Sequence, residues 1–129
     1  MQIANIIARV LLGLIYFVFG LNGFLGFLEV PAVPEVAGSF LGAMATTGFM
    51  SLVKALEVGF GALLLASIVL KRYAPLALTI LTPITVVIFF FHLFMAPAGM
   101  ATPIVLAILN GFLLYTYKDQ FAGLFVAHA

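Results

Sequence analysis

Long apolar runs separated by short polar breaks are the feature that most constrains what this chain can fold into. A helix needs about 20 mostly apolar residues to cross a bilayer, and four runs approach or exceed that length. Charged side chains make up only 7% of the 129 residues, against about 25% in soluble domains, and a soluble domain this small could not bury so much apolar surface. We therefore expect one all-α domain over residues 1–129, a polytopic membrane four-helix bundle with spans near 3–25, 49–70, 73–95 and 102–117.

The segments between the runs predict how the spans are joined. Residues 26–48 form a long connector with two prolines and two glutamates, in which a short helix starting near Pro34 is expected at the membrane surface. Lys71 and Arg72 form a tight charged turn. Pro83 lies inside the third run, where we expect it to kink the helix or to have the freed backbone group satisfied by its neighbours.

Basic residues predict the orientation of the bundle. Four spans place the first residues, the turn at residues 71–72 and Lys118 on one side of the membrane, and Glu29 and Glu35 on the other. Because basic residues favour the cytoplasmic side, we expect both termini in the cytoplasm and the long connector outside. We expect the first run to be a retained span rather than a cleaved signal peptide, because no charge precedes Arg9 and no small-residue cleavage site follows closely.

Composition excludes several classes of function. The chain has no cysteine, so internal disulfides, thiolate metal sites and dithiol redox chemistry are excluded. Its five lysines and arginines do not cluster, so nucleic acid is not an expected partner. One histidine, His92, and one carboxylate, Glu57, fall within the predicted spans, too few for a three-ligand metal site or for haem between two histidines.

Each predicted span contributes a polar side chain at a similar depth. With both termini inside, Asn22, Lys54, Glu57, His92 and Asn110 all fall within about the outer 12 Å of the membrane, at 1.5 Å of rise per residue. Small and polar residues also recur at helical spacing, so single stripes are expected to face the bundle interior. We predict an outward-facing polar pocket in which these five side chains are candidate ligand-binding residues.

Lys54 and Glu57 carry the strongest signal, and each has a structural alternative. Ionisable side chains inside a membrane are costly and usually functional. At a spacing of three residues the pair can equally be an ion pair that fixes helix packing. Lys54 can also extend its ammonium group to the outer interface.

The other candidates also have structural alternatives. His92 either handles a proton or contacts a ligand, or it makes an interfacial hydrogen bond at the end of its span. Asn110 either joins the site or holds two helices together. Arg9 is a sixth candidate ligand-binding residue, about two turns from the cytoplasmic end, and lipid phosphates are its alternative partner. Asn22 lies just off the small-residue stripe of its span, so spacing does not fix the direction in which it faces.

At these positions the chain resembles the DoxX-like (DoxX/DoxD) family of small bacterial membrane proteins. The stretches that carry the likeness, in order and spacing, are ARVLLGLIYFVFGLNGF, VKALEVGFGALLL and APLALTILTPITVVIFFFHLFMAPAG. The resemblance implies a four-helix bundle in the bacterial inner membrane with a loose redox association, since relatives include a subunit of a thiosulfate:quinone oxidoreductase. Arg9, Asn22, Glu57 and His92 match the family pattern. Many relatives have lysine where this chain has Gly23, and Lys54 would have to supply that charge here.

Three functions fit these features. The first is a redox-associated membrane subunit that binds a quinone or another lipid-soluble ligand, with no intrinsic cofactor, so that a partner redox protein must supply the electrons. The second is a small proton-coupled transporter or ligand-binding bundle that uses Glu57, either as a single chain or as a homo-oligomer. The third is a membrane scaffold whose polar groups fix helix register. We rank the redox association first, and the sequence leaves open whether the protein is an enzyme.

Overall fold

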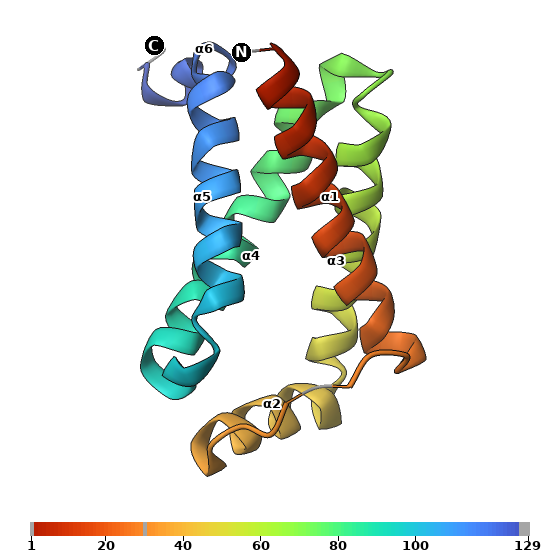
Figure 1. Cartoon of the computed structure of the whole chain (residues 1–129), viewed down its shortest axis with the longest axis vertical. Coiled ribbons are helices and arrows are strands. Elements are labelled where there is room, and N and C mark those ends of the chain that lie inside the picture. Colours follow the sequence, from red (N-terminus) through yellow and green to blue (C-terminus); the bar gives the residue numbers. More distant parts are fainter. Residues whose placement is uncertain (1, 30, 127–129) are drawn as a thin grey trace.

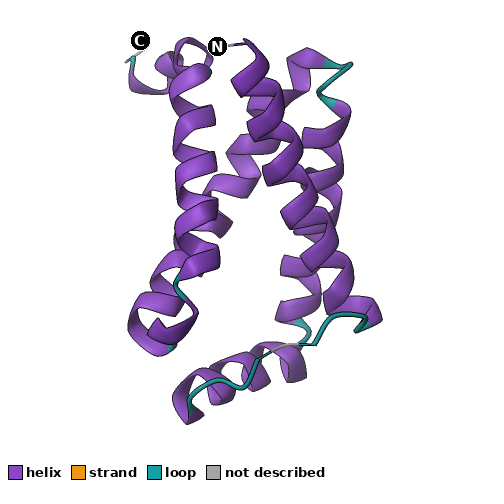
Figure 2. Ribbon diagram, in the orientation of Figure 1, coloured by secondary structure: helices purple, strands orange, loops and turns teal. Residues whose placement is uncertain are grey.

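The computed structural model describes residues 2–29 and 31–126, and every regular element in those ranges is helical, as the apolar runs predicted. The body of the molecule consists of α1 (Gln2–Leu25), α3 (Phe49–Ala66), α4 (Ala74–Met95) and α5 (Ala101–Thr116). Shorter elements join or follow these helices: α2 (Glu35–Thr47), α6 (Lys118–Phe121) and 3-10 turns at Lys71–Tyr73, Pro97–Gly99 and Ala122–Phe125. Figure 2 shows loops only at the breaks between helices.

The four long helices pack in a ring, in which α1 contacts α3 and α5, and α4 contacts the same two helices. The two ends of the chain lie at one end of this bundle (Figure 1). Toward the other end the α1–α3 pair diverges from the α4–α5 pair, and α2 lies across that end. The two helix pairs are therefore closest near the termini and farthest apart at the end that α2 crosses.

Glycines allow α1 and α3 to approach closely. A Cβ atom added at Gly61 of α3 would lie 2.9 Å from the backbone nitrogen of Phe17, and one added at Gly13 of α1 would lie 3.1 Å from the carbonyl oxygen of Gly61. Gly20 is also buried on the same face of α1. Small residues bring helix backbones together in this way, and the predicted small-residue stripe on the first run is confirmed.

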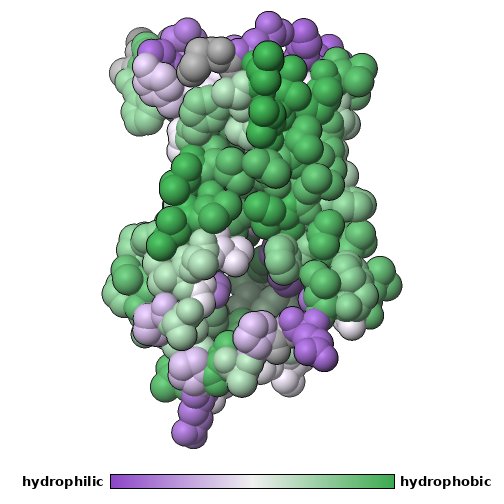
Figure 3. All heavy atoms as spheres, in the orientation of Figure 1, coloured by the Kyte–Doolittle hydropathy of each residue, from purple (hydrophilic) through white to green (hydrophobic). Residues whose placement is uncertain are grey.

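Apolar side chains fill the bundle and also cover its outside. The interior contains fully buried leucines from all four helices, including Leu12, Leu64, Leu78 and Leu113. The outer surface is hydrophobic along the middle of the molecule and hydrophilic at both ends (Figure 3). Three segments, α1, α3 and Lys71–Met95, are long and apolar enough to cross a membrane, and α5 is a shorter apolar helix.

The connector and the turns follow the sequence signals. The short helix expected near Pro34 is confirmed as α2, with Pro34 at its N-cap, and Gly48 in the left-handed conformation (φ 81°) turns the chain from α2 into α3. α3 ends at Ala66, earlier than the predicted run 49–70, because Ser67–Leu70 form turns. α4 continues as a helix through Pro83.

Candidate functional site

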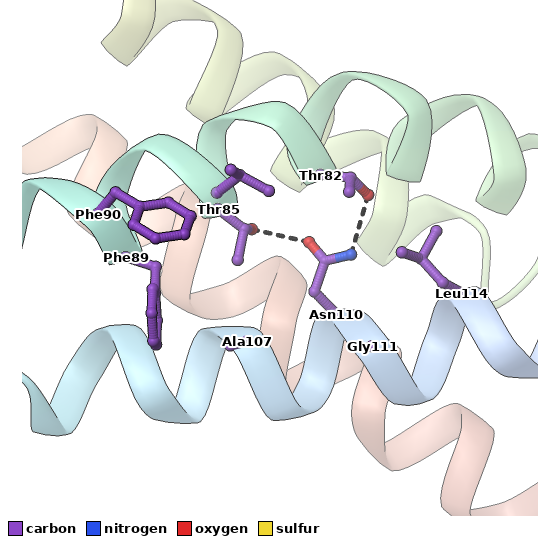
Figure 4. Close-up of a pocket in the computed structure, with 9 residues that line it drawn as sticks. Thr82, Thr85, Phe89, Phe90, Ala107, Asn110, Gly111 and Leu114 are labelled. Atoms are coloured by element: carbon purple, nitrogen blue, oxygen red, sulfur yellow. Dashed lines mark hydrogen bonds between the residues drawn. The ribbon is translucent and has the colours of Figure 1, made fainter. Parts of the chain in front are cut away.

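A layer of hydrogen-bonded polar side chains crosses the middle of the bundle. The Tyr16 hydroxyl on α1 lies 2.5 Å from the Thr85 hydroxyl on α4, which donates to Asn110 Oδ1 on α5 at 2.7 Å. Asn110 Nδ2 donates to the Thr82 hydroxyl at 2.9 Å. Figure 4 shows Asn110 reaching from α5 to both threonines of α4. The network therefore ties three helices together at one depth.

The direction of these hydrogen bonds follows from the number of available protons. A threonine hydroxyl has one hydrogen, which Thr85 can donate to Asn110 Oδ1 or to the carbonyl oxygen of Leu81 at 3.1 Å, and when it donates to Asn110 it must accept the hydrogen of Tyr16. The chain of donors then runs from Tyr16 to Thr85 to the carbonyl of Asn110. The carboxamide of Asn110 has two N–H groups, and only one of them donates to a side chain within the described residues.

Glu57 is the acidic side chain of the bundle interior. It lies on α3 with 3% of its surface exposed, and its Oε1 atom is 3.4 Å from Lys54 Nζ. Lys54 is more open, with 24% of its side chain exposed. The predicted pair is therefore present, with the carboxylate buried and the ammonium group facing partly outward.

Glycines of α1 make room for this pair. A Cβ atom added at Gly20 would lie 3.0 Å from Glu57 Cβ, and one added at Gly23 would lie 2.5 Å from Lys54 Cγ. The stem of Lys54 thus occupies the space in which a side chain at Gly23 would begin. The α1 glycines and the charged pair on α3 form one packing unit.

One carboxylate oxygen of Glu57 has no hydrogen-bond partner within the part of the chain that the structure describes. Among the described residues, no fully buried side-chain nitrogen or oxygen lacks a hydrogen-bond partner. The second carboxylate oxygen of Glu57 makes no hydrogen bond there, so it retains accessible surface. Figure 3 shows a hollow in the molecule above α2, with hydrophilic side chains at its edge.

A recess of about 230 Å³ leads into the bundle between α1 and α5. Its lining includes Ile15 and Phe19 of α1 and Val105 of α5. Side chains therefore leave part of the space between α1 and α5 unfilled.

His92 and Asn22 have local partners instead of joining Glu57. The Nδ1 atom of His92 lies 2.9 Å from the carbonyl oxygen of Ile88, one turn earlier in α4, and the ring packs over Gly99. Asn22 Oδ1 accepts a hydrogen bond from the backbone N–H of Leu28 at 2.6 Å. The first contact stabilises the end of α4 and the second stabilises the start of the connector.

Arg9 lies near the opposite end of the bundle, away from the charged pair, with 4% of its surface exposed. Its Nε atom donates to Asn5 Oδ1, and its Nη1 atom donates to the carbonyl oxygen of Ser67, each at 2.7 Å. A cation at this position complements the unpaired carbonyls at the end of α3. The guanidinium group therefore turns into the bundle and not toward lipid phosphates.

Several polar partners were not expected from the sequence. Helical spacing predicts Thr85 on an inward-facing stripe and Tyr16 as a packing residue, but not that their hydroxyl groups meet, and the sequence assigns no role to Asn5 or Ser67. The available signals were positional: Thr85 shares the stripe of His92, and Asn5 precedes Arg9 by four residues, one helical turn.

No group of three histidine, aspartate or glutamate side chains within the described residues is placed to hold a metal ion. The second histidine, His128, lies outside those residues. The chain has no significant match among protein families, curated proteins or solved structures.

Proposed function

We propose that this chain is a DoxX-like protein of the bacterial inner membrane, with α1, α3, α4 and α5 as its four spans. The apolar outer surface of the bundle supports this placement. α5 has 16 residues, about 24 Å of helix, so its flanking residues complete the crossing of a hydrocarbon core about 30 Å thick. Both termini face the cytoplasm, and α2 lies on the outer surface.

Within this bundle, Glu57 binds a quinone or a similar lipid-soluble ligand through its unpaired carboxylate oxygen. The observation that carries the proposal is a carboxylate with 3% of its surface exposed inside an apolar bundle, with one oxygen paired and the other free of hydrogen bonds to the described residues. A charged group in a membrane is costly, and a purely structural pair would be expected to satisfy both oxygens.

The charged pair offers complementary chemistry to such a ligand. The ammonium group of Lys54 can donate to a quinone carbonyl, and the free oxygen of Glu57 can accept from a hydroquinone hydroxyl. Reduction of a quinone to its hydroquinone requires two electrons and two protons. A partner redox protein supplies the electrons, and Glu57 is placed to pass protons to the ring.

The position of Lys54 also supports the DoxX-like proposal. Its stem passes over Gly23, at the position where many relatives have lysine. Lys54 therefore brings a positive charge from α3 to the position at which many relatives carry a lysine on their first helix. The other residues that match the family pattern, Arg9, Asn22 and His92, have structural partners, which leaves Glu57 as the centre of the proposed site.

Native mass spectrometry of the protein purified gently from its own membrane tests this proposal. Glu57→Gln removes the buried charge, and Glu35→Gln makes the same change on exposed α2. We expect a co-purifying quinone-sized species with the parent protein and with Glu35→Gln, and its loss with Glu57→Gln. Equal ligand occupancy in all three proteins, or bare protein throughout, would contradict the proposal.

A further inference from the structure

A second cavity lies between α4 and α5, on the outside of the bundle. It has a volume of about 280 Å³, close to twice the roughly 150 Å³ of an apolar cavity that binds benzene. Its walls include Phe89 and Phe90 of α4 and Ala107 and Gly111 of α5 (Figure 4). The space is therefore large enough for a substituted aromatic ring, with the two phenyl groups of α4 on one side and the smooth surface of α5 on the other.

The cavity opens sideways, toward the surroundings of the bundle. Val86 and Phe90 at its edge are 48% and 45% exposed. A Cβ atom added at Gly111 would meet no other atom within 4 Å, so the space over this glycine is empty. In the membrane placement proposed above, the cavity opens into the acyl chains.

One lining side chain has an unused hydrogen-bond donor. Asn110, Thr82 and Thr85 are the polar residues of the lining, and one N–H of Asn110 donates to Thr82. The second N–H of that carboxamide has no partner among the described residues. Acyl chains cannot accept a hydrogen bond, so this N–H favours a ligand that brings an acceptor.

We propose that this cavity binds an uncharged, lipid-soluble aromatic ring with a carbonyl group, which enters from the bilayer. The carbonyl accepts from Asn110, and the ring lies against Phe89 and Phe90. No charged side chain lines the cavity, so an ionised ligand has no counter-ion there. The proposal rests on the membrane placement and not on ligand binding at Glu57, since neither Glu57 nor Lys54 lines this space.

The absence of tryptophan from the sequence allows a clean fluorescence test. Phe90→Trp places a single reporter on the wall of the cavity, and Ile108→Trp places one on an exposed part of α5 at similar depth. The probe is 2-methyl-1,4-naphthoquinone, which quenches tryptophan on contact, added to protein in lipid vesicles. We expect saturable quenching of the Phe90→Trp reporter and weaker, linear quenching of the Ile108→Trp reporter.

A blocking variant identifies the cavity as the cause of saturation. Gly111→Leu, made in the Phe90→Trp protein, fills the empty space, and Gly59→Leu makes the same change where an added Cβ also meets no atom. We expect Gly111→Leu to weaken binding at least tenfold and Gly59→Leu to leave it unchanged. Val86→Phe is a second blocking variant, from the opposite wall, if Gly111→Leu disturbs folding.

Linear and equal quenching of both reporters would overturn the proposal, because it would show only partition of the probe into lipid. Unchanged saturation in both blocking variants would also overturn it. Glu57→Gln separates this site from the proposed one: saturation that survives Glu57→Gln and disappears in Gly111→Leu assigns binding to the cavity between α4 and α5. Saturation lost only with Glu57→Gln assigns the probe to the other site and contradicts the inference.

Discussion

Arg9 and Glu57 are both buried charged side chains, but their surroundings differ. Arg9 donates hydrogen bonds to Asn5 Oδ1 and to the carbonyl and hydroxyl oxygens of Ser67, directly after α3. Glu57 has one ion-pair partner, Lys54, and an oxygen with no hydrogen bond to the described residues. Arg9 therefore holds α1 against the end of α3, whereas Glu57 is the buried charge that we propose to bind a ligand.

Replacing Arg9 should weaken the bundle. Arg9→Met leaves the Ser67 carbonyl without its donor and leaves Asn5 Oδ1 with only the Tyr117 hydroxyl at 3.4 Å, and hydrogen bonds to charged groups contribute about 1.5–3 kcal/mol each. We expect the free energy of unfolding in detergent micelles to fall by about 2–3 kcal/mol. Arg72→Met, which changes an exposed arginine, is the control, and equal effects of the two changes would show that the buried contacts of Arg9 do not hold α1 to α3.

The sequence predicted the charged residues of the site better than the neutral ones. Lys54 and Glu57 were recognisable because two charges stand three residues apart in an apolar run. The contact of Tyr16 with Thr85 was not, because helical spacing gives the face of each helix but not the side chain that it meets across the bundle. Their hydroxyl groups meet across 69 positions of sequence, a pairing that only the arrangement of the helices decides.

Among the elements, α1 and α3 form the closest pair. Gly61→Leu places a side chain 2.9 Å from the backbone nitrogen of Phe17, which cannot move aside as a flexible side chain can. We expect the free energy of unfolding to fall by about 3 kcal/mol or more. Gly59→Leu, two residues away and facing open space, should change it by no more than about 0.5 kcal/mol.

The same comparison checks the origin of the close approach between the helices. If both leucine variants unfold at the same denaturant concentration as the parent, the α1–α3 contact is not limited by glycine. If both lose stability equally, the cost comes from the leucine side chain and not from its position.

The contact of α2 with α4 is small. The Phe40 ring on α2 lies 5.7 Å from the Phe91 ring on α4, between ring centres, and Gly48 and Gly26 flank the segment with positive φ angles. Phe40→Ala should speed amide hydrogen exchange of residues 35–47 by about two- to tenfold, since an aromatic pair contributes about 0.5–1.5 kcal/mol. Exchange in α1 and α3 should be unchanged, and an equal rise with the exposed-residue control Val36→Ala would contradict this role of Phe40.

For the whole molecule, the lengths of the apolar runs predicted the helices well. The position of α2 and the divergence of the helix pairs toward that end could not be predicted in the same way (Figure 1). The angle between the helices depends on where a glycine lets another helix backbone approach, as Gly61 does for the backbone of Phe17. Hydrophobic periodicity gives the face of a helix but not the depth and angle at which two faces meet.

The proposed orientation can be tested because the parent chain has no cysteine. Ser39→Cys lies on α2, and Gly123→Cys lies beyond α6 near the other end of the bundle. We expect a membrane-impermeant maleimide to label Ser39→Cys in intact cells, and Gly123→Cys only after the cells are opened. The reverse pattern would invert the orientation, and labelling of both in intact cells would contradict an even number of spans.

The most direct test of the account is the reactivity of Glu57 in lipid vesicles prepared without quinone. Dicyclohexylcarbodiimide is lipid-soluble and modifies carboxyl groups in apolar surroundings, and peptide mass spectrometry locates the product. We expect that Glu57 is modified and that an added lipid-soluble quinone slows its modification at least severalfold, with no such protection of Glu29, Glu35 or Asp119. An unreactive Glu57, or one that reacts equally fast with and without quinone, would contradict a ligand site at this side chain.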